Sequence, residues 1–124
     1  MTKGGSIILN ASMVSVKAVA AFSVYSATKA ALRSFARGWA VDLKDRGIRV
    51  NVVSPGPVPT PGYRNLGLGA DQIESVLAAQ SAAIPLGRVG TPEEVAHAVL
   101  FLASSDSSYV NASELFVDGG LAQV

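Results

Sequence analysis

Tyr25 and Lys29 are the two residues of this sequence whose types and spacing could do acid–base chemistry. Because they are four residues apart, a helix would place them one turn above each other on the same face. A free tyrosine releases its proton only near pH ~10, and a nearby positive charge favours the phenolate form. A phenol beside an ammonium is therefore a candidate general acid/base near neutral pH. Helices also carry this spacing as a plain solvated pair, so the rest of the chain decides between the two interpretations.

The composition narrows the class of protein. The chain has 124 residues, of which 49% are hydrophobic and 15% are charged, and its net charge is +1. This length predicts a single domain over 1–124 with enough apolar residues for a core. The near-neutral charge provides no electrostatic footprint for nucleic acid or for an acidic membrane surface.

The residue types also argue against several kinds of site. The chain contains no cysteine and one histidine, so we expect neither a disulfide framework nor a metal site. No apolar run reaches the roughly 18 residues that span a bilayer, and the first residues lack the layout of a signal peptide. We therefore expect a cytoplasmic protein without a nucleic-acid or membrane partner.

The elements around the pair predict one parallel unit. Residues 6–10 form a continuous apolar run, which is typical of a strand buried on both faces. A long helix is expected over about 23–46, with Gly47 as its left-handed stop, and a second strand over 48–53. Strand, helix and strand in this order predict parallel strands with a right-handed connection.

The long helix carries more apolar surface than one neighbour needs. Its 3.6-residue stripe consists of Leu32, Phe35, Ala36, Trp39 and Leu43. A second set of small residues would let another helix approach closely, from this chain or from a neighbouring subunit. We interpret these faces as core or subunit interface.

The second half of the chain completes the layout. Four prolines in 54–61 predict a stiff, extended loop, and a short helix is expected from Asp71. Residues 91–94, Thr-Pro-Glu-Glu, are a stronger helix start, because they combine a cap, a first-turn proline and a capping box. A third strand is expected over 114–117. The order of elements predicts an α/β fold: half of a doubly wound parallel-sheet (Rossmann-like) fold, with about three parallel strands and covering helices.

Several motifs in this order make the sequence resemble the carboxyl-terminal half of the short-chain dehydrogenase/reductase family. Ser12 ends the first strand 13 residues before Tyr25, which is the family spacing, and Tyr25-Ser-Ala-Thr-Lys29 matches the family's Tyr-x-x-x-Lys. Further matches are Arg49-Val-Asn-Val-Val-Ser-Pro-Gly56, Pro85-Leu-Gly-Arg88, Thr91-Pro-Glu-Glu94 and Val117-Asp-Gly-Gly120.

The resemblance implies a role for each matching residue. Tyr25 would exchange a proton with the substrate oxygen, Lys29 would assist it and bind the nicotinamide ribose, and Ser12 would hold the substrate oxygen. The implied cofactor-binding positions are Tyr25, Lys29, Pro55, Gly56, Val58 and Thr60. The implied activity is hydride transfer between NAD or NADP and a small carbonyl or secondary alcohol, in a homo-oligomer. The preference between the two cofactors and the identity of the substrate stay open.

The sequence departs from the family in two respects. It contains neither the family's Asn-Ala-Gly stretch nor the asparagine that completes the family's proton relay. The 124 residues also contain no glycine-rich Thr-Gly-x-x-x-Gly-x-Gly turn, which in the family precedes the serine loop and seats the pyrophosphate. We therefore expect this chain to be the catalytic half of such an enzyme. The alternative is a truncated, catalytically inactive remnant or an oligomerisation module. Without the glycine-rich turn we expect weak binding of the intact dinucleotide and little or no turnover by the isolated chain.

Overall fold

A single parallel sheet lies at the centre of the computed structural model, which describes residues 3–124; Met1 and Thr2, part of the domain expected over 1–124, lie outside the described residues. The strand order is β1-β2-β3 and both pairings are parallel. The strands are β1 (Ser6–Asn10), β2 (Arg49–Pro55) and β3 (Glu114–Val117). The three parallel strands confirm the predicted fold class.

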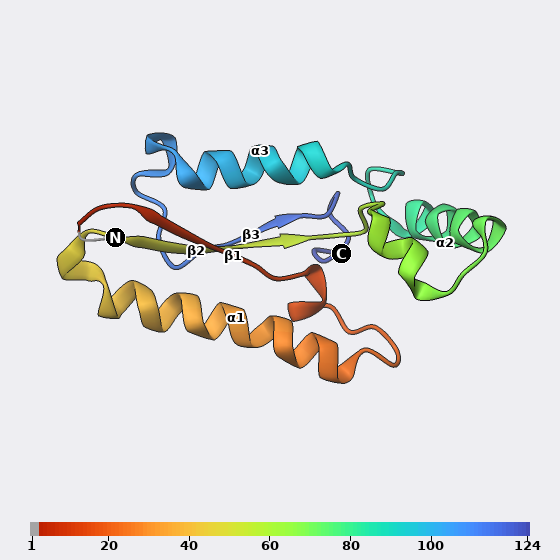
Figure 1. Cartoon of the computed structure of the whole chain (residues 1–124), viewed down its shortest axis with the longest axis horizontal. Helices are drawn as coiled ribbons and strands as arrows, with labels where there is room; N and C mark the ends of the chain where they lie inside the picture. The colour runs from red at the N-terminus through yellow and green to blue at the C-terminus, as the bar shows by residue number, and fades with distance from the viewer. Residues whose placement is uncertain (1–2) are drawn as a thin grey trace.

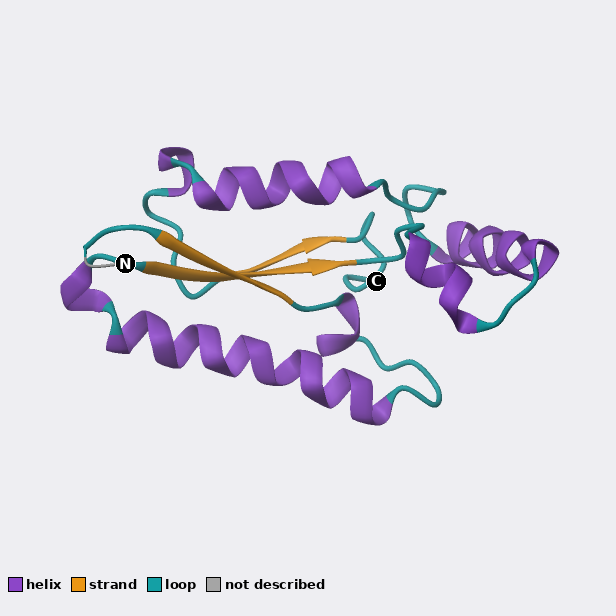
Figure 2. Cartoon of the chain, in the orientation of Figure 1, coloured by secondary structure: helices purple, strands orange, loops and turns teal. Residues whose placement is uncertain are grey.

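The helices lie on both faces and at one end of the sheet (Figure 1). The α-helices are α1 (Ser23–Asp42), α2 (Ala70–Ala83) and α3 (Pro92–Ala103). Figure 1 shows α1 on one face of the sheet, α3 on the other, and α2 beyond the carboxyl ends of the strands. Because the strands are parallel, their carboxyl ends lie at the same edge of the sheet. Helices α1 and α3 begin near this edge, and α2 lies beyond it (Figure 2).

Strand β2 is the buried centre of the sheet. Val50, Val52 and Val53 are almost wholly buried, and the polar Asn51 and Ser54 are buried with them. The Asn51 side chain donates to the Val110 carbonyl oxygen at 2.9 Å and accepts from the Ser113 amide at 3.0 Å, as its position in a buried strand requires.

The face of α1 that packs on the sheet is made of small residues. Ala36 and Ala40 are buried against Val50 and Val52, with Leu32 and Leu43 packed beside them. The apolar stripe predicted for this helix is therefore only partly buried. Phe35 and Trp39 stack on each other with ring centroids 5.5 Å apart, yet they are 51% and 39% exposed.

Residues close to the helix ends determine where α1 stops and α3 starts. Helix α1 stops at Asp42, four residues before the predicted end, and a 3-10 turn (Lys44–Arg46) leads to Gly47 at φ 61°. Helix α3 begins as predicted, since the Thr91 hydroxyl accepts from the Glu94 amide and the Glu94 carboxylate accepts from the Thr91 amide.

Within residues 3–124, no helix is both long and apolar enough to cross a membrane. The same residues contain no cluster of three or more His, Cys, Asp or Glu that could hold a metal ion.

Candidate active site

One cavity at the carboxyl edge of the sheet is lined by every residue that the sequence singled out. Its volume is about 430 Å³. The predicted residues in its lining are Ser12, Tyr25, Lys29, Pro55, Gly56, Val58 and Thr60, which come from the end of β1, the start of α1 and the loop after β2. The structure thus brings together residues up to 48 positions apart in the chain (from Ser12 to Thr60).

Tyr25 and Lys29 lie in the first two turns of α1, as their spacing predicts. The Lys29 ammonium nitrogen lies 5.6 Å from the centre of the Tyr25 ring and donates to the Asn10 carbonyl oxygen at 3.3 Å. The Tyr25 side chain also meets Phe22 edge-on, with ring centroids 5.9 Å apart. The ring is therefore held between an aromatic edge and a cation, and its hydroxyl has no hydrogen-bond partner among the described residues.

Ser12 ends the extended segment after β1 and caps a short 3-10 turn, η1 (Met13–Ser15). Its hydroxyl oxygen accepts from the Val14 amide at 3.4 Å, and its carbonyl oxygen accepts from the Ser15 amide at 2.9 Å. Since the Ser12 hydroxyl acts only as an acceptor here, its proton stays free to be donated into the cavity. The turn η1 was not predicted from the sequence.

Gly56 lies where β2 leaves the sheet, and the space beside it admits no side chain. Its amide donates to the Val117 carbonyl oxygen at 2.9 Å, which extends the ladder with β3 past the predicted end of the strand. An added Cβ would lie 2.7 Å from the Cα and Cβ of Asp118. The Asp118 carboxylate accepts from the Gly120 and Ala122 amides, so the backbone at Asp118 cannot easily retreat.

Val58 and Thr60 belong to the proline-rich loop, which a second segment supports. The Gly90 amide donates to the Pro57 carbonyl oxygen at 3.0 Å, and a Cβ at Gly90 would lie 3.2 Å from the Val58 side chain. The Thr60 hydroxyl makes no cap hydrogen bond to the turn that follows, η3 (Pro61–Leu66). Its hydroxyl is therefore available to the cavity.

Four lining residues were not predicted as part of the site: Asn10, Ala11, Pro92 and Val95. Asn10 and Ala11 directly precede Ser12, whereas Pro92 and Val95 belong to the first turn of α3, whose start the capping box at Thr91 sets. The signal for the helix start was present in the sequence. What the sequence did not reveal is that this start faces the same strand ends as Tyr25.

An exposed ion pair fixes the same helix start. The Arg88 guanidinium lies 2.6 Å from the Glu94 carboxylate and forms two hydrogen bonds with it. The Arg88 hydrogen bond, together with the Thr91 amide, lowers the pKa of Glu94 from its ordinary 4.5 to about 2. The same pair raises the pKa of Arg88.

The lining fits the nicotinamide half of a dinucleotide. Such a group needs an apolar wall for a flat ring and donors for ribose hydroxyls and a carboxamide. Pro55, Gly56 and Val58 provide the apolar wall, while the Lys29 ammonium and the Thr60 hydroxyl are donors on the same cavity. Residues that would seat a pyrophosphate on a glycine-rich helix start are not found in the 124-residue sequence.

The chain is similar to known proteins over nearly its whole length. A model of the family described as Enoyl-(Acyl carrier protein) reductase matches residues 1–122. Oxidoreductase asL5 of Sarocladium schorii is 50% identical over 121 residues, which are 98% of this chain and 47% of that protein. The chain spans about half the length of the curated relatives it matches.

Solved structures agree in fold and in extent. A short chain dehydrogenase/reductase family protein is 44% identical with a TM-score of 0.80, over 97% of this chain and 46% of that one. A gluconate 5-dehydrogenase from Burkholderia cenocepacia, solved in complex with NADP and tartrate, is 36% identical with a TM-score of 0.86. That likeness covers 98% of this chain and 46% of the dehydrogenase. With a family model that matches nearly its whole length, this chain belongs to the short-chain dehydrogenase/reductase family.

Proposed function

We propose that this chain carries the catalytic half of an NAD(P)-dependent oxidoreductase that interconverts a small carbonyl compound and a secondary alcohol. The observation that supports the proposal is the single cavity lined by Ser12, Tyr25 and Lys29 together with the loop after β2. The named relatives that are oxidoreductases, and the neighbour solved with NADP, support the reaction class and the cofactor. Either NAD or NADP satisfies the proposal.

In the proposed reaction each residue handles the substrate oxygen or its proton. The Ser12 hydroxyl donates a hydrogen bond to the carbonyl oxygen, and the Tyr25 hydroxyl gives that oxygen a proton as the alcohol forms. The Lys29 ammonium stabilises the phenolate left on Tyr25 and binds a ribose hydroxyl. When bound, the reduced nicotinamide supplies the hydride that the carbonyl carbon receives. The reverse order of proton movements oxidises the alcohol.

The deciding experiment follows the hydrogen atom itself. The purified chain is incubated with a small ketone and with NADH or NADPH that carries deuterium at C4, and the alcohol is analysed by mass spectrometry. We expect only a low level of deuterium on the carbinol carbon with the native chain, because a dinucleotide without its pyrophosphate seat binds weakly, and none with Tyr25→Phe. Absence of deuterium with both cofactors at high concentration would overturn the proposal in favour of the non-catalytic alternative.

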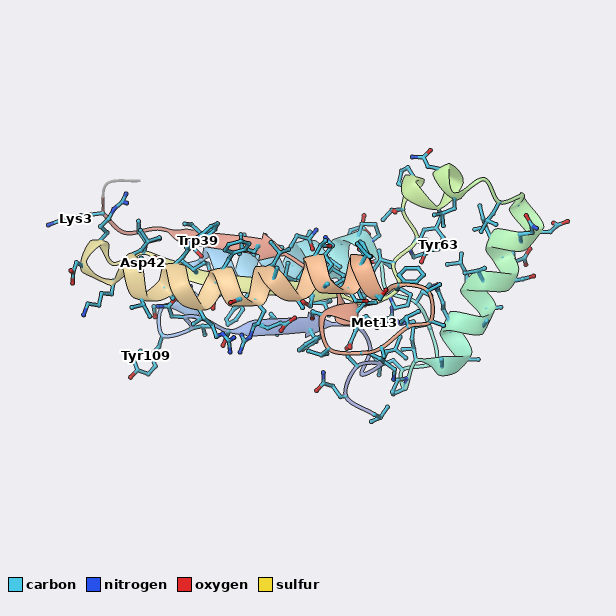
Figure 3. The ribbon with its side chains drawn as sticks, turned by 90° about the horizontal axis from the view of Figure 1, so that it is seen from below. Lys3, Met13, Trp39, Asp42, Tyr63 and Tyr109 are labelled. Carbon is cyan, nitrogen blue, oxygen red and sulfur yellow. The ribbon has the colours of Figure 1, made fainter. Side chains whose placement is uncertain are left out.

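The proposal includes a homo-oligomer. The stacked pair Phe35 and Trp39, which are 51% and 39% exposed, places apolar surface on the outer side of α1 (Figure 3 shows Trp39 on this helix). Contact between copies would remove this surface from water. A cytoplasmic location stays a prediction from the cysteine-free composition.

A further inference from the structure

Glu114 is a buried carboxylate that the proposed reaction does not use. It opens β3, in register with Val52 of β2, and only 6% of its side chain is exposed. A buried charge is costly unless hydrogen bonds and an opposite charge compensate it. The partners of this carboxylate therefore show what it holds together.

Two hydroxyl groups donate to the same Glu114 oxygen. The Ser15 hydroxyl and the Ser54 hydroxyl each lie 2.6 Å from Oε1. Ser15 closes the 3-10 turn that Ser12 caps, because its amide donates to the Ser12 carbonyl oxygen at 2.9 Å. Ser54 directly precedes the Pro55-Gly56 turn. One carboxylate oxygen thus joins the two loops that form the serine and nicotinamide walls of the cavity.

The third partner comes from the helix of the acid–base pair. The Arg33 side chain nitrogen Nε lies 3.8 Å from the other carboxylate oxygen of Glu114. Arg33 is four residues beyond Lys29, so it lies one turn further along the same face of α1. A second guanidinium nitrogen donates to the Ala112 carbonyl oxygen at 2.9 Å, which anchors Arg33 to the start of β3.

We infer that Glu114 is a positioning residue of the active site, whose carboxylate holds the Ser12 turn, the Pro55-Gly56 turn and helix α1 in one fixed relation. The inference rests on the proposed function of the site. Each partner of Glu114 belongs to a different element, and each of those elements either contains residues that line the catalytic cavity or, for η1, directly follows one, Ser12. A hydroxyl bond to an ionised acceptor is short and strong, so it limits the movement of both loops.

The first test measures backbone amide hydrogen exchange in the full chain by NMR and needs no activity. The reporters are the hydrogen-bonded amides of Ser15 and Gly56, and the reference is the amide of Ser104 at the far end of α3. In Glu114→Leu, which removes the acceptor at similar volume, we expect exchange of both reporters to speed by about tenfold or more relative to Ser104. Glu114→Gln keeps one acceptor oxygen for both hydroxyls and should restore protection.

Uniform acceleration at Ser15, Gly56 and Ser104 would mean that Glu114 serves general stability only, and it would overturn the inference. If Glu114→Leu does not fold, Ser15→Ala and Ser54→Ala test the same loops one at a time. In Ser15→Ala the Ser15 amide should lose protection while Gly56 keeps it, and Ser54→Ala should show the converse. Glu74→Gln, a change at an exposed glutamate of α2, is the matched control and should change none of these rates.

The second test measures deuteride transfer in the same variants. We expect Glu114→Leu to lower the transfer rate by about tenfold or more, with Glu114→Gln rescuing it. Ser15→Ala and Ser54→Ala should each slow the native chain but have no further effect in the Glu114→Leu background. Additive losses would overturn the inference. A native chain without any transfer would instead refute the proposed function, while the exchange data would still decide whether Glu114 positions the loops.

Discussion

The ammonium of Lys29 lies 5.6 Å from the centre of the Tyr25 ring, one helical turn away from it. The ammonium also donates to the Asn10 carbonyl oxygen at the end of β1, so the lysine ties the helix to the strand end beside Ser12. The pair therefore lies at the junction of α1 and β1.

Removal of the Tyr25 hydroxyl should abolish deuteride transfer with little change in cofactor binding. In Tyr25→Phe the ring keeps its contacts with Phe22 and Lys29, and only the proton donor is lost. General acid catalysis of this kind contributes about 10²–10⁴-fold to a rate. The rate is measured with deuterated cofactor, and binding by the NMR shifts that reduced nicotinamide mononucleotide induces.

Tyr109→Phe is the control for that change, since Tyr109 is fully exposed and is labelled away from Tyr63 and α2 in Figure 3. Its rate should equal that of the native chain. A Tyr25→Phe protein that retains most of its transfer rate would argue against proton donation by this residue.

A methyl group at Gly56 should destabilise the fold as well as the site. The added Cβ of Gly56→Ala would lie 2.7 Å from two atoms of Asp118, and overpacking of this kind costs about 1–3 kcal/mol. Urea unfolding monitored by circular dichroism measures the change. Gly38→Ala is the opposite control: no atom lies within 4 Å of its added Cβ, and alanine in a helix interior stabilises by about 0.5–1 kcal/mol. Equal effects of the two substitutions would contradict the packing at Asp118.

The Arg88–Glu94 pair should make stability sensitive to acid. Because the pKa of Glu94 is lowered from 4.5 to about 2, its contribution is complete above pH 4.5 and is lost as the pH falls toward 2. Thermal unfolding midpoints across this range should fall less steeply in Glu94→Gln than in the native chain. Glu93→Gln, a change at the exposed neighbour, should leave the steepness unchanged. An identical pH profile for Glu94→Gln would show that the ion pair is not maintained in solution.

The isolated chain should use its cofactor without saturation. The sequence has no glycine-rich turn to seat the pyrophosphate, so under the proposed function the dinucleotide would be bound through its nicotinamide half alone. The transfer rate should be slow and should rise linearly with NADH or NADPH concentration. Reduced nicotinamide mononucleotide should support a similar rate at equal concentration. A transfer rate that saturates at micromolar dinucleotide would contradict this prediction and would indicate a pyrophosphate site without a glycine-rich turn.

Removal of the aromatic pair on α1 should weaken association between copies. Phe35→Ala combined with Trp39→Ala deletes two stacked, exposed rings without touching the buried Ala36 and Ala40. Light scattering should show a lower mean mass for this variant than for the native chain. Tyr109→Ala removes a fully exposed aromatic ring elsewhere and should not change the mass. A monodisperse native monomer would contradict the proposed oligomer.

Much of the fold could be predicted from the sequence because it depends on local chemistry. The apolar run of β1, the span of β3, the capping box at Thr91 and the left-handed Gly47 all act within a few residues of chain. The proximity of Tyr25 and Lys29 was predictable for the same reason, since the two residues need only a helix to become neighbours. Their catalytic roles stay predictions until the substitutions are made.

Only the tertiary structure decided which surfaces and charges are buried. The apolar stripe of α1 does not reveal that Ala36 faces the sheet while Phe35 faces outward, because that choice depends on how closely the helix approaches the strands. The bonds of Glu114 to Ser15 and Ser54 span 99 and 60 residues. No local pattern encodes contacts of that range; the parallel pairing of β2 and β3 creates them by setting Glu114 in register with Val52, within reach of Ser54.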